Sequence, residues 1–133
     1  MRLQVGMDLV VVADVQEAVH DHADRYLTRI FSSRELGDCL DAPPAITAER
    51  LAARFAAKEA AMKVLRAVSE NGDEPLAWNT IEVVRSISGA PKLAFSGRAA
   101  EVARAAGVAD VSVSLTHERE YAAAVVVAQV EPA

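Results

Sequence analysis

The sequence predicts an α+β protein in which a mostly antiparallel sheet packs against one long central helix. The expected elements follow the order strand, helices, hairpin, helix, hairpin, whereas a parallel sheet would require alternating strands and helices. The longest expected helix covers residues 47–69, in the middle of the chain. The 133 residues are most simply one domain, residues 1–133, and a chain of this length buries roughly two-thirds of its unfolded surface.

Composition narrows the classes of function. The chain is 52% hydrophobic but only 5% aromatic, and its net charge is −5. An acidic protein with few aromatic side chains lacks both the charge and the stacking platforms of a nucleic-acid-binding protein. Cys39 is the only cysteine, so an intrachain disulfide is excluded and a reducing compartment is indicated. No secretory signal is recognisable, and the uncharged run 121–130 is about half the ~20 residues of a membrane span. We therefore expect a soluble, cytoplasmic protein that binds neither nucleic acid nor membrane.

The first element is a strand in which every second residue from Leu3 to Leu9 is apolar and alternates with Gln4, Gly6 and Asp8. This pattern predicts that the apolar residues form the packed face and that Asp8 lies on the opposite face beside Gly6. An ionised carboxylate inside an apolar run is costly without a cation or several donors. Asp8 is therefore either a metal-ligand candidate or an ordinary turn cap.

Two helices are expected next, over residues 14–30 and from Ser33 towards Asp41. The charge of the first helix changes sign along its length. Its start is acidic, with Asp14, Glu17, Asp21 and Asp24, and its far end is basic, with Arg25, Arg29 and Arg34. Ser32 and Glu35 have the spacing of a capping box for the second helix. The pair Pro43-Pro44 is expected to end that helix and to form a linker.

The central helix should begin with Thr47 as its N-cap and end near Ser69, before the stop signal at residues 71–75. On a helical wheel the expected core-facing stripe consists of Leu51, Phe55, Met62 and Leu65. Glu59 lies about 40° from Phe55, and Lys58 about 60° away on the other side. Lys63 follows Glu59 by one turn. These charges either form a solvated edge with a Glu59–Lys63 pair worth about 0.3–0.5 kcal/mol, or meet a polar partner from elsewhere in the chain.

The second half of the chain predicts two hairpins separated by a helix. After a loop containing Trp78, strands are expected at residues 80–86 and 92–95 around a turn at 89–91, and a helix capped by Ser96 at 97–106. Strands 111–116 and 121–130 form the second hairpin. Its first strand places hydroxyls on one face and apolar residues on the other: Ser112, Ser114 and Thr116 opposite Val111, Val113 and Leu115. With His117 at the end, this row suits either anion binding or simple solvation. No glycine-rich phosphate loop is present in the sequence, so side chains would have to hold a phosphate.

Three segments together resemble the holo-acyl-carrier-protein synthases, the small 4′-phosphopantetheinyl transferases. They are residues 5–10 (VGMDLV), 54–63 (RFAAKEAAMK) and 114–124 (SLTHEREYAAA). The similarity extends over nearly the whole chain, including the strand at 81–83 and the turn at 89–91. It implies the 4′-phosphopantetheinyl transferase fold and a homotrimer with active sites between subunits.

The resemblance also implies an activity, the Mg²⁺-dependent transfer of phosphopantetheine from coenzyme A to a serine of an apo acyl carrier protein. Such an enzyme supports fatty acid or polyketide biosynthesis and releases adenosine 3′,5′-bisphosphate. By this resemblance Asp8 and Glu59 are the protein ligands of Mg²⁺. Glu59, directly or through a water, accepts the serine proton, and Lys63 stabilises charge on the leaving phosphate.

Arg54, His117, Thr116 and, less directly, Lys58 would contact the nucleotide end of coenzyme A, and Lys63 its phosphates. The carrier would dock on the first helix, at Asp14, His22, Arg25, Tyr26 and Arg29. The family commonly has a basic residue where this chain has Asp14, so the identity of the carrier stays open. An alternative is a non-catalytic trimeric module that binds coenzyme A or a carrier protein.

Overall fold

A three-stranded antiparallel sheet and helix α3 form the two layers to which the rest of the chain attaches. The computed structural model describes residues 1–72 and 74–132. The large sheet has strand order β1-β5-β4, and β2 and β3 form a separate two-stranded sheet. Every strand pair is antiparallel, so the predicted α+β class is confirmed. In chain order the elements are β1 (Arg2–Val11), α1 (Val12–Ile30), α2 (Ser33–Cys39), α3 (Pro44–Val68), η1 (Trp78–Thr80), β2 (Ile81–Arg85), β3 (Pro91–Phe95), α4 (Gly97–Ala105), β4 (Val108–His117) and β5 (Tyr121–Val130).

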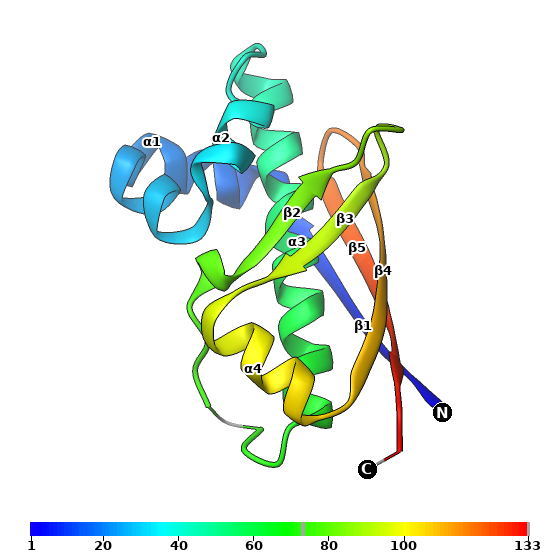
Figure 1. The fold of residues 1–133 in the computed structure, drawn as a ribbon. Helices are drawn as coiled ribbons and strands as arrows, with labels where there is room; N and C mark the ends of the chain where they lie inside the picture. The colour runs from blue at the N-terminus through cyan, green and yellow to red at the C-terminus, as the bar shows by residue number, and fades with distance from the viewer. Residues whose placement is uncertain (73, 133) are drawn as a thin grey trace.

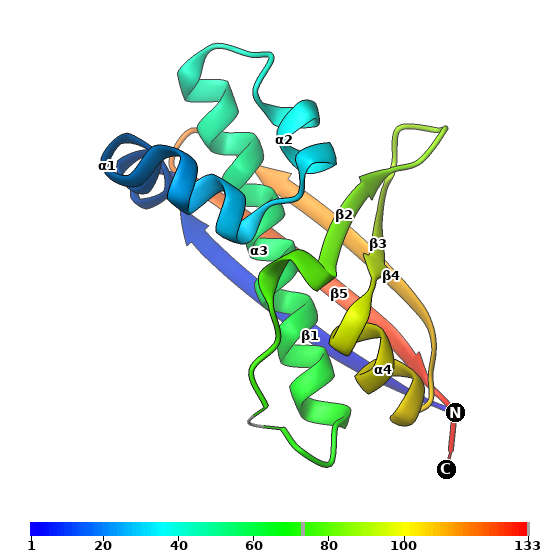
Figure 2. The same ribbon diagram turned by 60° about the vertical axis from the view of Figure 1, so that its left-hand side comes forward.

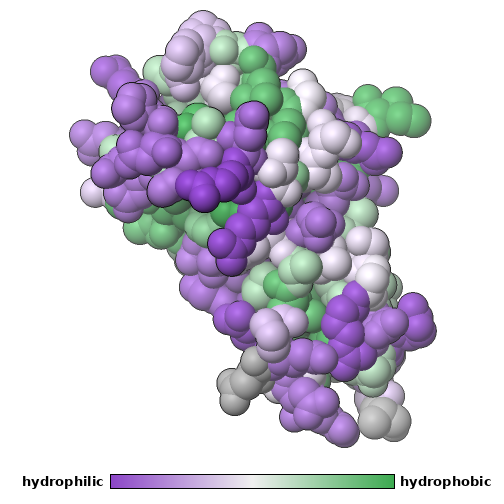
Figure 3. Space-filling view, turned by 90° about the vertical axis from the view of Figure 1, so that its left-hand side faces the viewer, coloured by the Kyte–Doolittle hydropathy of each residue, from purple (hydrophilic) through white to green (hydrophobic). Residues whose placement is uncertain are grey.

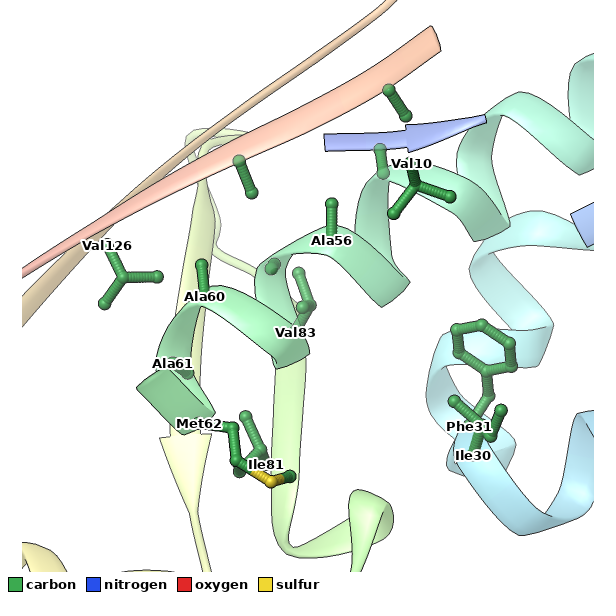
Figure 4. Packing of buried hydrophobic residues seen from close by; sticks show 14 of the residues in the cluster. Val10, Ile30, Phe31, Ala56, Ala60, Ala61, Met62, Ile81, Val83 and Val126 are labelled. Carbon is green, nitrogen blue, oxygen red and sulfur yellow. The ribbon is translucent and has the colours of Figure 1, made fainter. Parts of the chain in front are cut away.

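Helix α3 is buried on nearly all sides, so the prediction of a single apolar stripe is wrong. Figures 1 and 2 show α3 running alongside the large sheet, with α1 and α2 near its first half and α4 near its second half. In Figure 4, Ala56 and Ala60 face Val10 and Val126 of the sheet, while Met62 lies beside Ile81. Phe55 is only partly buried and contacts the Trp78 ring at a centroid distance of 5.2 Å. The many alanines allow neighbouring elements to approach the helix backbone closely.

The closest approach is between β1 and α3, at Gly6. A Cβ atom at this position would lie 2.2 Å from the carbonyl oxygen of Ala60 and 2.9 Å from Cγ2 of Val64. Only glycine fits in this contact. Because side chains two residues apart lie on the same face of a strand, the contact also directs Asp8 and Val10 toward α3.

The predicted packed face of β1 is therefore wrong. Leu3, Val5, Met7 and Leu9 are 60%, 55%, 61% and 62% exposed, whereas Gly6 and Val10 are buried. A period of two separates the faces of a strand but does not say which face meets the core. Here the helix selects the face with the smallest residue, and the apolar face is left outward.

The helix boundaries differ from the predictions in three places. Helix α1 begins at Val12 and contains a kink at Ala23, whose φ of 42° is not helical. Pro44 is the first residue of α3 instead of part of a linker, because a proline at this position lacks only an N–H that has no partner inside the helix. Thr47 is not the N-cap; its hydroxyl donates to the carbonyl oxygen of Cys39 at 3.0 Å. The capping box of Ser32 and Glu35 is confirmed.

The remaining boundaries agree closely with the sequence. Strand β5 and the C-cap of α3 at Ser69 match the predictions, and β2, β3 and α4 agree within one residue at each end. Ser96 precedes α4 but its side chain makes no capping hydrogen bond. Strand β4 is longer than predicted. Asp73, within the predicted stop signal, lies outside the described residues. Across residues 1–72 and 74–132, none of the helices has the length and apolar character needed to cross a bilayer.

The Gly6 contact predicts a large loss of stability on adding one methyl group. Gly6→Ala should lower the free energy of unfolding by at least about 2 kcal/mol and the Tm by roughly 6 °C or more. Gly37→Ala is the matched control, because its added Cβ meets no atom within 4 Å apart from its chain neighbours and the backbone of its own helix. Calorimetry showing equal Tm values for Gly6→Ala and the unmodified protein would contradict the close approach.

Candidate functional site

Asp8, Glu59 and Lys63 meet where β1 crosses α3. The Lys63 ammonium donates to the carbonyl oxygen of Met7 at 2.8 Å and to Oδ1 of Asp8 at 3.2 Å. Burial and the nearby Asp8 carboxylate raise the pKa of Glu59, while Lys63 and Arg66 act in the opposite direction. Lys63 therefore links α3 to β1. Strand β1 is the polar partner that the sequence left open for Glu59 and Lys63.

The donors of this cluster fit a hard divalent cation. Two carboxylates that repel one another are stabilised by a shared cation, and Mg²⁺ is commonly held by one or two carboxylates while it keeps several waters. In the described part of the chain, no group of three or more His, Cys, Asp or Glu side chains is placed to hold a metal. Asp8 and Glu59 are the two carboxylates of this cluster that could hold such a cation.

A second polar feature is a cavity of about 220 Å³ between the first half of α3, the β2–β3 hairpin and the end of β4. We call it the arginine pocket. Arg54 is only 6% exposed, pairs with Oδ2 of Asp38 at 3.7 Å, and has a buried Nε without a hydrogen-bond partner in the described structure. The residues that line the arginine pocket are Arg50, Ala53, Arg54, Val83, Arg85, Gly89, Pro91, Leu115 and His117. Three guanidinium groups and an imidazole suit a phosphate.

The structure brings Arg54 and His117 together in this pocket but leaves Thr116 outside it. Leu115 and His117 line the pocket, and Thr116 points to the opposite face of β4, where it is exposed like Ser112 and Ser114. The predicted row of hydroxyls thus lies on the outer face of the sheet. His117 also lies near Glu49, with Nδ1 3.9 Å from Oε1.

The structure contradicts Lys58 as a contact of coenzyme A. Its side chain is 0% exposed, and Nζ lies 2.8 Å from Oε1 of Glu35, which is also 0% exposed. The ammonium further donates to the carbonyl oxygens of Trp78 and Ile81. Burial lowers the pKa of Lys58, and the interaction with Glu35 opposes that shift. The wheel placed Lys58 at the edge of a stripe, but this side of α3 is covered as well.

Sequence reasoning missed Arg50, Arg85, Gly89 and Pro91 as pocket residues. Arg50 was detectable, because it precedes Arg54 by four residues and so lies one helical turn away. Arg85 was not, since it reaches the pocket only through the position of β2 against α3. The turn that contains Gly89 and Pro91 was predicted, but not as part of a site.

The predicted docking residues lie on α1, and the kink divides them. Asp14 and His22 precede Ala23, whereas Arg25, Tyr26 and Arg29 follow it. All except Tyr26 are exposed. Tyr26 packs edge-on against Phe31 with centroids 6.1 Å apart, and burial raises its pKa to about 12. Figure 3 views this side of the molecule, where hydrophilic side chains predominate.

Comparison with known proteins identifies the family. The model of the 4′-phosphopantetheinyl transferase superfamily matches residues 4–126. The chain belongs to this superfamily. It is 43% identical over 131 residues to a holo-[acyl-carrier-protein] synthase of Chloroflexus aurantiacus, covering 92% of this chain and 95% of the relative. A second such synthase, from Koribacter versatilis, is 38% identical over 127 residues, covering 96% and 98%. The resemblance stated from the sequence motifs is confirmed.

Solved structures agree with this membership. The Chronobacterium ammoniagenes ACPS-CoA complex superimposes with a TM-score of 0.81 at 26% identity, covering 99% of this chain and 100% of that one. The Helicobacter pylori holo-[acyl-carrier-protein] synthase in complex with coenzyme A gives 0.78 at 28% identity, covering 95% and 100%. The predicted 4′-phosphopantetheinyl transferase fold is confirmed.

The electrostatics of the cluster predict a coupled titration. Because the Asp8 carboxylate helps to raise the pKa of Glu59, Asp8→Asn should lower the pKa of Glu59 toward its ordinary value in metal-free buffer. Carbon-detected NMR of the Glu59 carboxyl measures this shift. Glu70→Gln, at an exposed position beyond the end of α3, is the control and should leave it unchanged. An unchanged pKa of Glu59 in the Asp8→Asn protein would show that the two carboxylates do not interact.

Proposed function

We propose that the protein transfers 4′-phosphopantetheine from coenzyme A to a serine of an apo acyl carrier protein, which yields the holo carrier and adenosine 3′,5′-bisphosphate. One observation carries the proposal. A paired-carboxylate and lysine cluster and an arginine pocket share one helix, and Arg54 and Glu59 are separated by only about 7.5 Å along its axis. A diphosphate with a second phosphate at its nucleotide end needs both features.

The chain's own groups would serve distinct steps of this reaction. The serine oxygen forms a bond to the β-phosphorus of coenzyme A while the bond from that phosphorus to the bridging oxygen breaks. Glu59, directly or through a water, would accept the serine proton. Lys63 offers positive charge to the leaving phosphate. Mg²⁺ held by Asp8 and Glu59 would neutralise the diphosphate and polarise the bond that breaks.

The arginine pocket would receive the nucleotide end of coenzyme A. Arg50, Arg54 and Arg85 supply its positive charge, His117 adds a ring nitrogen, and the guanidinium fork matches phosphate oxygens. The related proteins of Chronobacterium ammoniagenes and Helicobacter pylori were solved with coenzyme A, which supports this use of the pocket. A non-catalytic binding module would have a use for the pocket but none for the cluster of Asp8, Glu59 and Lys63.

The outward apolar face of β1 supports a homotrimer. It continues onto β5, where Val125 pairs with Met7 and Val127 pairs with Val5, and it is larger than isolated exposed apolar residues would make it. The hydroxyl row of β4 borders this face, with Ser114 opposite Val125. We propose that this face packs against other copies of the chain, which would bring Thr116 to an active site shared between subunits. We also propose that the protein acts in the cytoplasm.

Removing either proposed metal ligand should abolish most transfer without unfolding the protein. Asp8→Asn and Glu59→Gln remove charge but keep shape, so circular dichroism should stay unchanged. The test is mass spectrometry of an apo carrier incubated with coenzyme A and Mg²⁺. The unmodified enzyme should add about 340 Da to the carrier, and each variant should add it far more slowly. Normal turnover by either variant at low Mg²⁺ would contradict the assignment.

A charge on the apolar face should dissociate the trimer. Light scattering of the unmodified protein should give about three times the 14.2 kDa chain mass. Val5→Glu should give the mass of one chain, because each interface would bury an unpaired carboxylate. Ile87→Glu alters an equally apolar and fully exposed residue at a distant hairpin tip and should keep the trimer. A fully active monomer of the unmodified protein would rule out shared sites.

The sign change along α1 suggests which carriers the enzyme prefers. An acidic carrier helix would be repelled by Asp14 and the acids that follow it, and attracted by Arg25 and Arg29. We therefore propose a preference for a carrier that is less acidic at the end facing Asp14, such as a polyketide or other specialised domain. Charges at the rim of an interface mainly change the association rate and its salt dependence.

Asp14→Arg tests this preference with a strongly acidic carrier. It should raise kcat/KM by roughly three- to tenfold, which corresponds to about 0.7–1.4 kcal/mol, and leave kcat nearly unchanged. Added salt should narrow the gain, since exposed charges are screened over about 8–10 Å at 0.1–0.15 M. Glu70→Arg makes the same change of charge far from α1 and is the control. An unchanged kcat/KM in Asp14→Arg at low salt would show that Asp14 is not part of the docking surface.

A further inference from the structure

The ion pair between Glu35 and Lys58 has no part in the chemistry proposed above, yet it occupies the centre of the molecule. Both side chains are 0% exposed, and Oε1 of Glu35 lies 2.8 Å from Nζ of Lys58. Replacing a buried ion pair by well-packed neutral residues is often neutral or even stabilising, because burial removes two charges from water. Stability alone is therefore a weak explanation for this pair.

Glu35 joins two elements to the pair. Its Oε1 accepts from the backbone N–H of Ser32 at 2.9 Å and so caps α2. Its Oε2 accepts from the backbone N–H of Val83 in β2 at 2.9 Å. One carboxylate thus ties the start of α2 to the middle of β2 while it binds the ammonium from α3.

Lys58 joins α3 to the segment that leads into β2. Its ammonium donates to the carbonyl oxygen of Trp78 at 3.1 Å and to that of Ile81, the first residue of β2. The same nitrogen lies 5.8 Å from the centre of the Phe31 ring, just before α2. The Lys58 ammonium and the Glu35 carboxylate therefore form all their hydrogen bonds named above with backbone groups or with each other.

Two of the three elements that the pair joins line the arginine pocket, and the third contacts one of its arginines. Helix α3 supplies Arg50 and Arg54, and β2 supplies Val83 and Arg85. Helix α2 does not line the pocket but holds Arg54 through Asp38, whose carboxylate lies 3.7 Å from a terminal nitrogen of Arg54. Val83 is the most direct link, since its backbone N–H binds Glu35 and the residue itself lines the pocket.

We propose that Glu35 and Lys58 are positioning residues for the arginine pocket. Without contacting a ligand, the pair sets the spacing of α2, α3 and β2, and so the convergence of Arg50, Arg54 and Arg85 on one phosphate. A specific polar network fixes distance and direction between elements, which apolar packing of the same volume does less strictly. The identity of the ligand rests on the proposed function; the positioning role does not.

The test replaces the pair by uncharged residues of similar size, Glu35→Gln with Lys58→Met. This double variant leaves no unpaired buried charge, but the carbonyl oxygens of Trp78 and Ile81 lose the Lys58 donor, so its Tm should fall while the protein stays folded. Calorimetric titration should show the Kd for adenosine 3′,5′-bisphosphate raised by roughly tenfold, because displacements of about 1 Å loosen a multidentate site. The KM for coenzyme A should rise in parallel, with kcat changed by less than about twofold. The matched control removes an exposed ion pair of α4, Arg98→Gln with Glu101→Gln, and should leave Kd and KM unchanged.

A folded double variant with unmodified Kd and KM would overturn the proposal. If the double variant does not fold, Glu35→Asp takes its place, since it keeps the charge pair but is too short to reach both Lys58 and the N–H of Val83. A folded Glu35→Asp protein with the unmodified Kd would equally overturn it. The unmodified protein separates this question from the reaction: if it binds the bisphosphate but modifies no carrier, the proposed function fails while the binding comparison still decides the positioning role.

Discussion

The contact of Gly6 with the backbone of α3 is the constraint on which the site depends. With its Cα held against the carbonyl of Ala60, β1 must turn its glycine face inward. Asp8 then follows onto α3, where it meets Lys63 and, together with the larger effect of burial, raises the pKa of Glu59. The same choice of face turns the apolar residues of β1 outward, so one close contact both assembles the proposed metal site and creates the surface proposed for assembly.

Helix α3 separates its charges by giving each a different partner. Arg54 faces α2 and the arginine pocket, Lys58 is sealed against Glu35, and Glu59 and Lys63 meet β1. Four charged residues within less than three turns thus serve three environments. The surrounding alanines make this possible, because they let elements on several sides come close enough for short polar side chains to reach the helix.

Local signals predicted much of the fold. The capping box of Ser32, the bounds of β5 and the end of α3 depend on neighbouring residues, and these predictions were correct. The pairing of Asp8 with the Glu59 region was also indicated, because two misplaced acids needed a common partner. What failed depended on packing between distant segments: the orientation of β1, the burial of Lys58, and the arrival of Arg85 at the pocket. Periodicity on a wheel assumes one buried face, and α3 has several.

The proposed cation site between Asp8 and Glu59 is the central claim, and anomalous diffraction tests it most directly. Crystals grown with Mn²⁺, a close substitute for Mg²⁺ at oxygen ligands, should show an anomalous peak within coordination distance of both carboxylates, about 2.0–2.3 Å. Crystals of the Asp8→Asn protein grown in the same way should lose most of that peak. An anomalous peak only at another place, or no peak between these two residues at saturating Mn²⁺, would contradict the proposal that β1 and α3 build the site.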